Sequence, residues 1–499
     1  MSSRFVYAVA SFVFGGFGAI GLAPHGIWSA TIASLAIAFF VFSRAETVKD
    51  AAFYGWLYGI GYFIVALFWI VEPFFVEPEV YGWMAPFALP LMAGGLALFW
   101  SAAFGLAFVS SYRSGYRSGA SLVVTWGLAE FVRAYVFTGF PWAAPAQIWV
   151  GSGPDLLLSV IGPHGLGMMT LLAGYSAYAL VSSLEPWFLR VSTPLLAVLI
   201  IGLGFIFEYN LPDVTFSEFT VRIVQPNAPQ DEKWDPEKAP IFFARQLRAT
   251  RAGPERPDLV VWPETSLLRV LKRADEALGQ IVGAAQGSQV LLGVNRRDRD
   301  AYYNSLIVVD PSGQIVATYD KHHLVPFGEY LPFSRWLRSS GIRALAEWSD
   351  GGYAPGLHPH LISLGEIGKA LPLICYEAIF PQHARVRGER PDMLVQITND
   401  AWFGTYSGPY QHLAQARMRA IEQGLPMIRS ANTGVSAMID PYGRIVGNIE
   451  MGQDGFIDSA LPVPLKPTIY SYTGDWPVLL LLLAISIGTV MLKQRNRLL

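Results

Sequence analysis

Hydrophobic residues gather in long runs near the two ends of the chain, whereas the middle mixes polar and hydrophobic positions more evenly. A helix that crosses a lipid bilayer needs about 20 mainly apolar residues, within a range of about 17 to 25. Eight runs reach or approach that length, at residues 5–22, 27–42, 51–71, 83–108, 120–137, 165–184, 191–207 and 476–492. The pattern predicts a membrane bundle of eight helical spans, seven before the polar segment and one after it.

The polar segment alternates short β-rich runs with turns and helical stretches, which is typical of an α/β domain. Nine runs predict strands, at residues 219–227, 258–265, 289–296, 303–310, 314–320, 370–377, 393–399, 426–432 and 436–440. Two stretches with helical spacing, residues 267–286 and 412–424, predict helices. β-turns with the sequence Asp-Pro-X-Gly are predicted at residues 310–313 and 440–443.

Composition and loop charge support this division and orient the chain. Charged residues make up 15% of the chain, whereas soluble domains contain about 25%. Lys and Arg occur near both ends of the chain and in every second loop between the apolar runs. The intervening loops, at residues 23–26, 72–82 and 138–164, contain neither Lys nor Arg. Both termini are therefore expected in the cytoplasm. We predict a seven-span bundle at residues 1–209, a domain at 210–470 on the side opposite the cytoplasm, and a helix with a cytoplasmic tail at 471–499. In a bacterial inner membrane the side opposite the cytoplasm is the periplasm.

The only cysteine, Cys375, ends the apolar part of a predicted strand. A nucleophile at the end of a strand lies at a sheet edge, where a substrate can approach, and a nearby cation activates a thiol. Glu264 and Lys321 close two other predicted strands. A carboxylate, an ammonium and a thiol at strand ends would form an acyl-transfer site. The alternative is that Cys375 is a small residue of the core.

Two ionisable residues, Glu130 and Arg133, lie inside the fifth apolar run, where an unpaired charge is costly. Their spacing places them on one helical face, so they either pair with each other or contact a lipid headgroup. Six aromatic residues near the expected outer interface form either a platform for substrates or an ordinary interfacial belt. They are Trp69, Phe74, Phe75, Trp83, Trp142 and Trp149.

Several motifs of the polar segment resemble those of a known family. VVWPET, YDKHHLVPFGEYLP, LPLICYEAIFP and QITNDAWFG, in this order, resemble the nitrilase superfamily, whose members share a Glu-Lys-Cys triad on an αββα sandwich with the carbon-nitrogen hydrolase fold. KWD at residues 233–235, PFGEY at 326–330 and CYE at 375–377 resemble more narrowly the apolipoprotein N-acyltransferase family. The resemblance covers nearly the whole chain.

This resemblance implies a role for each residue of the triad. Cys375 would be the nucleophile, Glu264 the general base, and Lys321 the cation that stabilises the charged tetrahedral intermediate. The backbone N–H of Tyr376 would be a second donor to the developing oxyanion.

The resemblance also implies supporting roles for Trp234, Glu329, Tyr376 and Glu377. A second carboxylate is expected to hold Lys321 in place; the alternative for Glu329 and Glu377 is a solvated surface position. Trp234 either lines the path of the acyl chain or packs against the edge of the sandwich. The long segment at residues 339–356 is expected to be a movable cover over the site.

The family resemblance implies two membrane substrates. A phospholipid such as phosphatidylethanolamine would give its acyl chain to Cys375 as a thioester, and the α-amino group of a diacylglyceryl-cysteine lipoprotein would accept it, which completes lipoprotein maturation. We expect a monomer with no metal or other cofactor, and no nucleic-acid partner because the net charge is only −2. Two rival functions stay open: a membrane-tethered amidase that uses water as acceptor, and a transporter or scaffold whose α/β domain only binds.

Overall fold

The computed structural model describes residues 3–112, 119–267, 269–332, 352–385 and 388–498. Its chain divides into two compact units. The helical unit comprises Met1–Pro212, Tyr406–Ala414 and Pro467–Leu499, and the sheet unit comprises Asp213–Thr405 and Gln415–Lys466. The predicted cover at residues 339–356 lies outside the described residues, except for residues 352–356.

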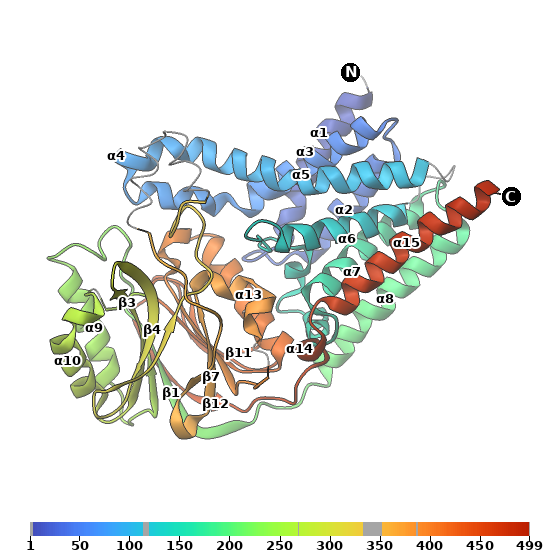
Figure 1. Cartoon of the computed structure of the whole chain (residues 1–499). Helices are drawn as coiled ribbons and strands as arrows, with labels where there is room; N and C mark the ends of the chain where they lie inside the picture. Colours follow the sequence, from blue (N-terminus) through green and yellow to red (C-terminus); the bar gives the residue numbers. More distant parts are fainter. Residues whose placement is uncertain (1–2, 113–118, 268, 333–351, 386–387, 499) are drawn as a thin grey trace. The chain divides into compact units, whose positions relative to one another are not determined.

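Each of the eight predicted apolar runs forms a helix of the helical unit (Figure 1). These helices are α1 (Ser3–Gly18), α2 (Trp28–Ser43), α3 (Val48–Ala66), α5 (Ala85–Tyr112), α6 (Gly119–Tyr135), α7 (Leu158–Val181), α8 (Trp187–Tyr209) and α15 (Trp476–Leu498). Two short helices, α4 (Pro78–Tyr81) and α14 (Ile469–Thr473), precede α5 and α15.

Some of these helices have the length and composition of a complete membrane span. Among the described residues, four segments have this length and composition: Ser3–Gly21, Pro78–Ser111, Gly153–Val181 and Trp187–Tyr209. A fifth results if Val48–Ala66 and Phe68–Phe75, which are bent by 50° relative to each other, form one span. Trp28–Ser43 and Trp476–Gly488 are apolar but shorter. The helical unit therefore contains several apolar helices of membrane length, and the number of eight spans stays a prediction.

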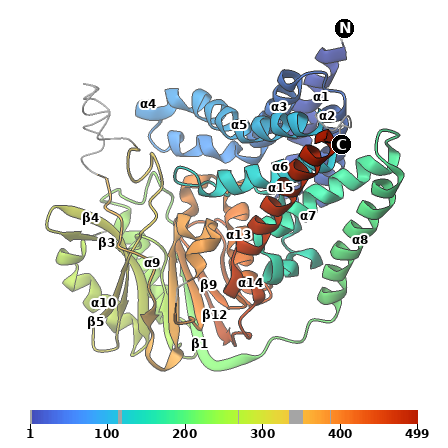
Figure 2. The ribbon, with the colours of Figure 1, turned by 45° about the vertical axis from the view of Figure 1, so that its right-hand side comes forward.

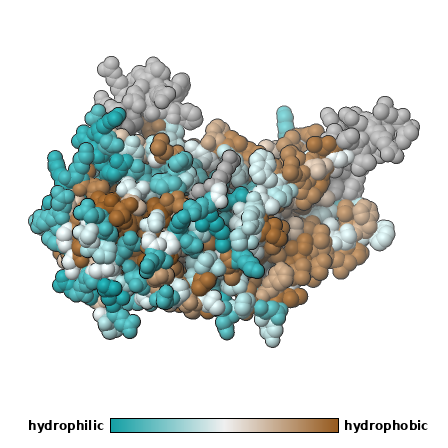
Figure 3. Space-filling view, turned by 60° about the horizontal axis from the view of Figure 1, so that its bottom comes forward, coloured by the Kyte–Doolittle hydropathy of each residue, from teal (hydrophilic) through white to brown (hydrophobic). Residues whose placement is uncertain are grey.

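The helical unit exposes hydrophobic side chains over a wide surface (Figure 3). On α8, Leu195, Val198 and Leu199 are each at least 60% exposed. Water-soluble monomers rarely expose large contiguous apolar surfaces. The outer face of α8 is therefore suited to a lipid environment.

Glycines allow α1 and α3 to pack closely. A Cβ atom at Gly15 would lie 2.1 Å from the carbonyl oxygen of Tyr58, and one at Gly61 would lie 2.0 Å from that of Phe12. Small residues that let two backbones approach are typical of helix packing in membranes. Substitution of either glycine would force the two helices apart.

Glu130 and Arg133 form a buried ion pair within α6. Nε and Nη2 of Arg133 donate to the two carboxylate oxygens of Glu130 at 3.1 and 2.6 Å. Nη1 donates to the carbonyl oxygens of Phe140 and Trp142, and Trp100 Nε1 donates to Glu130 at 2.7 Å. Because Arg133 is only 2% exposed and these partners use most of its donors, the prediction of mutual pairing is confirmed and the headgroup alternative is wrong.

The segment Tyr406–Ala414 belongs to the helical unit, although it lies inside the predicted α/β domain. Oε1 of Gln411 accepts hydrogen bonds from the indoles of Trp69 and Trp142 at 3.3 and 2.7 Å. Nε2 of Gln411 donates to the carbonyl oxygen of Ala66 at 3.1 Å. This amide therefore fixes the segment to the helical unit.

The six aromatic residues predicted at the outer interface do not share one environment. Trp69, Trp142 and Trp149 are buried. The prediction of a surface platform or belt is wrong for these three, because each indole N–H has a partner inside the helical unit. Phe75 and Trp83 are exposed, as an interfacial position requires.

The sheet unit contains two six-stranded sheets, with the strand orders β12-β1-β2-β3-β4-β5 and β11-β10-β9-β8-β7-β6 (Figure 1). The strands are β1 (Phe216–Gln225), β2 (Leu259–Val261), β3 (Gln289–Asp298), β4 (Ala301–Val309), β5 (Ile315–Asp320), β6 (Ile362–Ser363), β7 (Lys369–Ile374), β8 (Met393–Thr398), β9 (Met427–Ala431), β10 (Ser436–Ile439), β11 (Ile445–Ile449) and β12 (Gly455–Pro462). All nine predicted strands form, and the pattern missed β6, β11 and β12.

Three longer helices belong wholly or partly to the sheet unit: α9 (Ala239–Arg251), α10 (Asp275–Ala285) and α13 (Gly408–Gln423). The predicted helix at residues 412–424 corresponds to α13, whereas α9 was not predicted. The predicted helix at residues 267–286 is too long, since α10 begins at Asp275 and is preceded by a short 3-10 helix at Leu271–Arg273. Its first residue, Leu267, instead pairs with Val294 in an isolated β-bridge.

The two sheets pack face to face around one hydrophobic core. This core combines Val221 and Leu306 of the first sheet with Ile374 and Val395 of the second. A separate cluster, which includes Ile281 of α10, covers the opposite face of the first sheet. In both ribbon views α9 and α10 flank that sheet (Figure 2). The packing fixes the strand ends, from which the candidate site is built.

Candidate active site

The ends of three strands bring Glu264, Lys321 and Cys375 into one buried site. Glu264 follows β2, Lys321 follows β5 and Cys375 follows β7. Each of the three is at most 6% exposed. Lys321 Nζ lies 3.5 Å from Glu264 Oε1, and both charges act on the thiol of Cys375. The three residues predicted at strand ends therefore meet.

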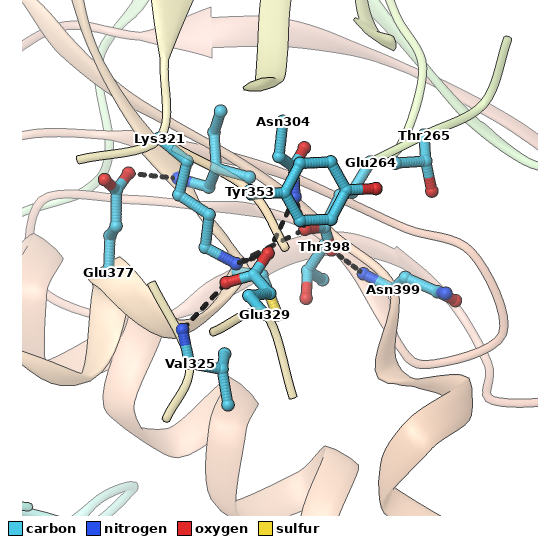
Figure 4. A network of polar contacts seen from close by, with 12 residues as sticks. Glu264, Thr265, Asn304, Lys321, Val325, Glu329, Tyr353, Glu377, Thr398 and Asn399 are labelled. Carbon is cyan, nitrogen blue, oxygen red and sulfur yellow. Dashed lines mark hydrogen bonds and ion pairs between the residues drawn. The ribbon is translucent and has the colours of Figure 1, made fainter. Parts of the chain in front are cut away.

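Lys321 is the cation of a polar network that also contains Glu264 and Glu329 (Figure 4). Its Nζ donates to Glu329 Oε1 at 2.9 Å. Burial alone would lower the pKa of Lys321, but the carboxylates of Glu329 and Glu264 outweigh burial and raise this pKa. Lys321 therefore stays positively charged in a buried site, where a fixed cation can stabilise an oxyanion.

Both carboxylate oxygens of Glu264 have fixed donors. Oε1 accepts a hydrogen bond from Asn304 Nδ2 at 2.6 Å, and Oε2 accepts one from the backbone N–H of Asn399 at 2.9 Å. Together with Lys321, these donors hold the carboxylate in one orientation. A general base needs such fixed geometry toward the proton that it removes.

Cys375 combines a strained backbone with a buried thiol. Its φ is +51°, in the left-handed region that L side chains rarely adopt. Burial is the largest effect on the thiol and, with the charge of Glu264, it raises the pKa of Cys375, although Lys321 opposes this. The thiol is therefore protonated at neutral pH, and a base must remove the proton before the sulfur can attack.

Glu329 supports Lys321 from a position that is only 12% exposed. Besides the contact with Lys321, its Oε1 accepts from Asn304 Nδ2 at 3.1 Å, and its Oε2 accepts from the N–H of Val325 at 2.8 Å. The surface alternative for Glu329 is therefore wrong. Its geometry agrees with the expectation that a second carboxylate holds the lysine.

Glu377 is fully buried and joins two backbone segments of the site. Its Oε1 accepts from the backbone N–H of His322 at 2.8 Å, and its Oε2 accepts from that of Ile374 at 2.7 Å. These two residues are the neighbours of Lys321 and Cys375 in the sequence. The surface alternative is wrong for Glu377 as well, and this side chain positions the backbone, whereas Glu329 contacts the lysine.

Trp234 and Tyr376 differ in exposure. Trp234 is 47% exposed, which is compatible with both of its predicted roles, at the edge of the sandwich or along the path of the acyl chain. Tyr376 is buried, with its ring 5.0 Å from that of Phe380 between centroids. Burial raises the pKa of Tyr376, which therefore stays a neutral phenol.

The sequence pattern missed several residues that complete the site. Asn304 and Asn399 supply the donors to Glu264. A Cβ atom at Gly293 would lie 2.7 Å from Glu264 Cα and 2.6 Å from the backbone nitrogen of Thr265, so only glycine lets β3 approach this turn. Asn304 could have been identified as a polar residue within an otherwise apolar strand. Gly293 could have been identified as a glycine in the interior of a strand.

Lys233, from the KWD motif, is a buried lysine behind Glu264. Its Nζ donates to the carbonyl oxygen of Glu264 at 3.2 Å and to Thr265 Oγ1 at 2.7 Å. Burial lowers the pKa of Lys233 to about 8, although Glu264 opposes this effect. Because Thr265 has a φ of +45°, the lysine holds a strained turn at the general-base candidate.

The ammonium of Lys321 lies between the carboxylates of Glu264 and Glu329. In the part of the chain that the structure describes, no three side chains of His, Cys, Asp or Glu are grouped so that they could hold a metal ion. The reactive groups of the site are an ammonium, carboxylates and a thiol.

Comparison with known proteins identifies the family. The sequence matches the family "Apolipoprotein N-acyltransferase N-terminal domain" over residues 14–176 and "Carbon-nitrogen hydrolase" over residues 220–464. The apolipoprotein N-acyltransferase of Rhodopseudomonas palustris is 36% identical over 515 residues, which cover 98% of this chain and 95% of the relative. The chain belongs to the apolipoprotein N-acyltransferase family.

Further relatives and solved structures are also similar to the chain. The apolipoprotein N-acyltransferase of Brucella melitensis is 36% identical over 524 residues, which cover 98% of this chain and 96% of the relative. A CN-hydrolase superfamily protein from Xanthomonas campestris is 21% identical, covers 52% of this chain and 96% of its own, and has a TM-score of 0.36. As a member of the apolipoprotein N-acyltransferase family, the chain is an acyltransferase and a membrane protein.

We expect the substitution Glu264→Gln to change how the alkylation of Cys375 depends on pH. In the native protein Glu264 takes the thiol proton internally, so the thiolate fraction should change little with pH near neutrality. In Glu264→Gln the raising effect of the Glu264 charge is lost, but burial still raises the pKa of the thiol, and the solvent must take its proton. The rate of reaction with iodoacetamide should then rise about tenfold per pH unit.

The single cysteine of the chain makes this rate specific to Cys375. Glu276→Gln, on the exposed side of α10, is the matched control and should keep the native profile. Equal slopes for the native protein and Glu264→Gln would contradict the role of Glu264 as the base.

Proposed function

We propose that this acyltransferase moves a fatty acyl chain from a phospholipid to the N-terminal α-amino group of a diacylglyceryl-cysteine lipoprotein, through a thioester on Cys375. The observation that carries this proposal is the position of Lys321, between two carboxylates and within electrostatic reach of a protonated thiol. The names of the relatives supply the acceptor class.

In the first half-reaction, Glu264 removes the proton of Cys375, and Sγ attacks the ester carbonyl carbon of the phospholipid. The negative charge that develops on the carbonyl oxygen is stabilised by Lys321 and by the backbone N–H of Tyr376. The tetrahedral intermediate then collapses, the ester C–O bond breaks, and Glu264 returns the proton to the departing lysophospholipid. The acyl chain remains on Cys375 as a thioester.

In the second half-reaction, the neutral amine of the lipoprotein attacks the carbonyl carbon of the thioester. Glu264 takes a proton from the attacking nitrogen, and the same donors stabilise the oxyanion. Collapse breaks the C–S bond and forms the amide, and Glu264 then reprotonates the sulfur. The enzyme returns to its starting charge, so one carboxylate serves both steps.

We assign the half-exposed indole of Trp234 to the path of the acyl chain. A hydrocarbon chain that leaves the bilayer needs an apolar contact outside the buried site, and an exposed indole supplies one. Phe327, which is 66% exposed and lies two residues before Glu329, would be a second apolar contact for the chain.

The proposed reaction takes place at the outer surface of a bacterial inner membrane. Eight spans would hold both termini in the cytoplasm and the sheet unit, as an αββα sandwich, in the periplasm, where both lipid substrates are accessible to one monomer. The alternation of Lys and Arg among the loops and the apolar helices of membrane length support this arrangement.

The acyl-enzyme is the most direct test of the first half-reaction. Purified protein incubated with phospholipid labelled in its acyl chain, without an acceptor, should retain the label on the peptide that contains Cys375, as measured by mass spectrometry. Cys375→Ala should retain none, and Cys375→Ser should retain little label as an oxygen ester, since a hydroxyl is far less nucleophilic than a thiolate. Full turnover by Cys375→Ala would exclude the covalent mechanism.

The orientation can be tested with two exposed positions in a Cys375→Ala background. We expect Glu255→Cys, in the sheet unit, to react with a membrane-impermeant maleimide on intact spheroplasts. Val48→Cys, at the start of α3, should react only after lysis. The reverse labelling pattern would refute the periplasmic site, and labelling of both positions on the same side of the membrane would refute the number of spans.

A further inference from the structure

Thr398 ends β8 directly beside the nucleophile. The parallel register of β7 and β8 pairs Ile374 with Ile397, so the next residue of each strand, Cys375 or Thr398, lies at the same level. Thr398 is fully buried and is drawn within the polar network of Figure 4. A buried hydroxyl at this place needs a partner for its single proton.

Two acceptors compete for the hydroxyl proton of Thr398. Thr398 Oγ1 donates to Asp400 Oδ1 at 2.9 Å. It also makes a hydrogen bond with the side chain of Cys375, which lowers the pKa of the thiol against the larger opposing effect of burial. Because a threonine hydroxyl carries one proton, it can donate fully to only one of these groups at a time.

Asp400 is fixed as the resting acceptor. Its Oδ2 accepts from Arg429 Nη2 at 2.5 Å, and both side chains are completely buried. Arg429 also donates to Gln396 Oε1, and Gln396 Nε2 donates to the carbonyl oxygen of Cys375 at 3.4 Å. The carboxylate is therefore held in place behind Thr398 by a rigid group of residues.

We propose that the hydroxyl of Thr398 donates to Asp400 when the sulfur of Cys375 is protonated or acylated, and turns to the sulfur when it is a thiolate. A thiolate is a strong acceptor of hydrogen bonds, whereas a thioester sulfur is a weak one. Only the hydroxyl hydrogen moves, by rotation about the Cβ–Oγ1 bond. The inference rests on the proposed function in that the thiolate of Cys375 is the nucleophile and the leaving group.

This rotation would assist both half-reactions. It lowers the free energy of the thiolate that attacks the phospholipid, and it does the same for the thiolate that leaves when the amine attacks the thioester. Between these steps, Asp400 withdraws the donor from the neutral sulfur. A valine at position 398 keeps nearly the same shape but removes the donor, and a serine keeps the hydroxyl.

The test compares the rate at which iodoacetamide alkylates Cys375 in the native protein, Thr398→Val and Thr398→Ser, at the same pH. We expect Thr398→Val to react about tenfold more slowly, since a charge-assisted hydrogen bond to the thiolate is lost. Thr398→Ser should react at nearly the native rate. Thr318→Val, an exposed position of β5, is the matched control and should have no effect.

A native rate for Thr398→Val, or an equal loss for Thr398→Ser and Thr398→Val, would overturn the proposal, because the hydroxyl would then not be the important group. If Thr398→Val does not fold, Thr398→Ala is compared with Thr398→Ser by the same criterion. Alkylation requires neither lipid substrate. The alkylation rates can therefore be interpreted even if the acyl-transfer proposal fails. A failure of the acyl-transfer proposal can thus be distinguished from a failure of the proposal for Thr398.

Discussion

The buried ammonium of Lys321 is the charge on which the rest of the site depends. Glu264 and Glu329 both lie within 3.5 Å of it. Without a cation, two carboxylates so close together would repel each other. Because the ammonium stays charged, Glu264 can act as a base while the same cation faces the developing oxyanion. Glu377 and Gly293 serve this arrangement by fixing the backbone on either side of it.

Each of the two sheets supplies some of the residues of the site. The first sheet supplies the base and the cation at the ends of β2 and β5, and the second supplies the thiol and Thr398 at the ends of β7 and β8. The relative position of these groups is set by the hydrophobic core between the sheets. A close-packed core resists small shifts, so the geometry of the reaction is a consequence of packing as well as of polar contacts. The strained φ of Cys375 is maintained in the same way.

Local patterns predicted much of this structure, and contacts between distant residues account for the rest. Apolar runs and alternating positions depend on nearby residues alone, and the strand ends led to Glu264, Lys321 and Cys375. The helix at residues 267–286 was predicted too long because Leu267 pairs with β3 instead of continuing a helix. The burial of Trp142 depends on Gln411, which is 269 positions away in the sequence. Asn304 carries no motif that marks it as a shared donor for two carboxylates.

The central claim is that one site passes an acyl chain to an amine. It is tested most directly by isolating the acyl-enzyme, removing free lipid, and adding a synthetic diacylglyceryl-cysteine peptide in a single turnover. The account predicts that the label moves from Cys375 to the α-amino nitrogen of the peptide as an amide, at a rate faster than the thioester hydrolyses. Release of the label only as free fatty acid, at the same rate with or without the peptide, would contradict it and favour a hydrolase that uses water.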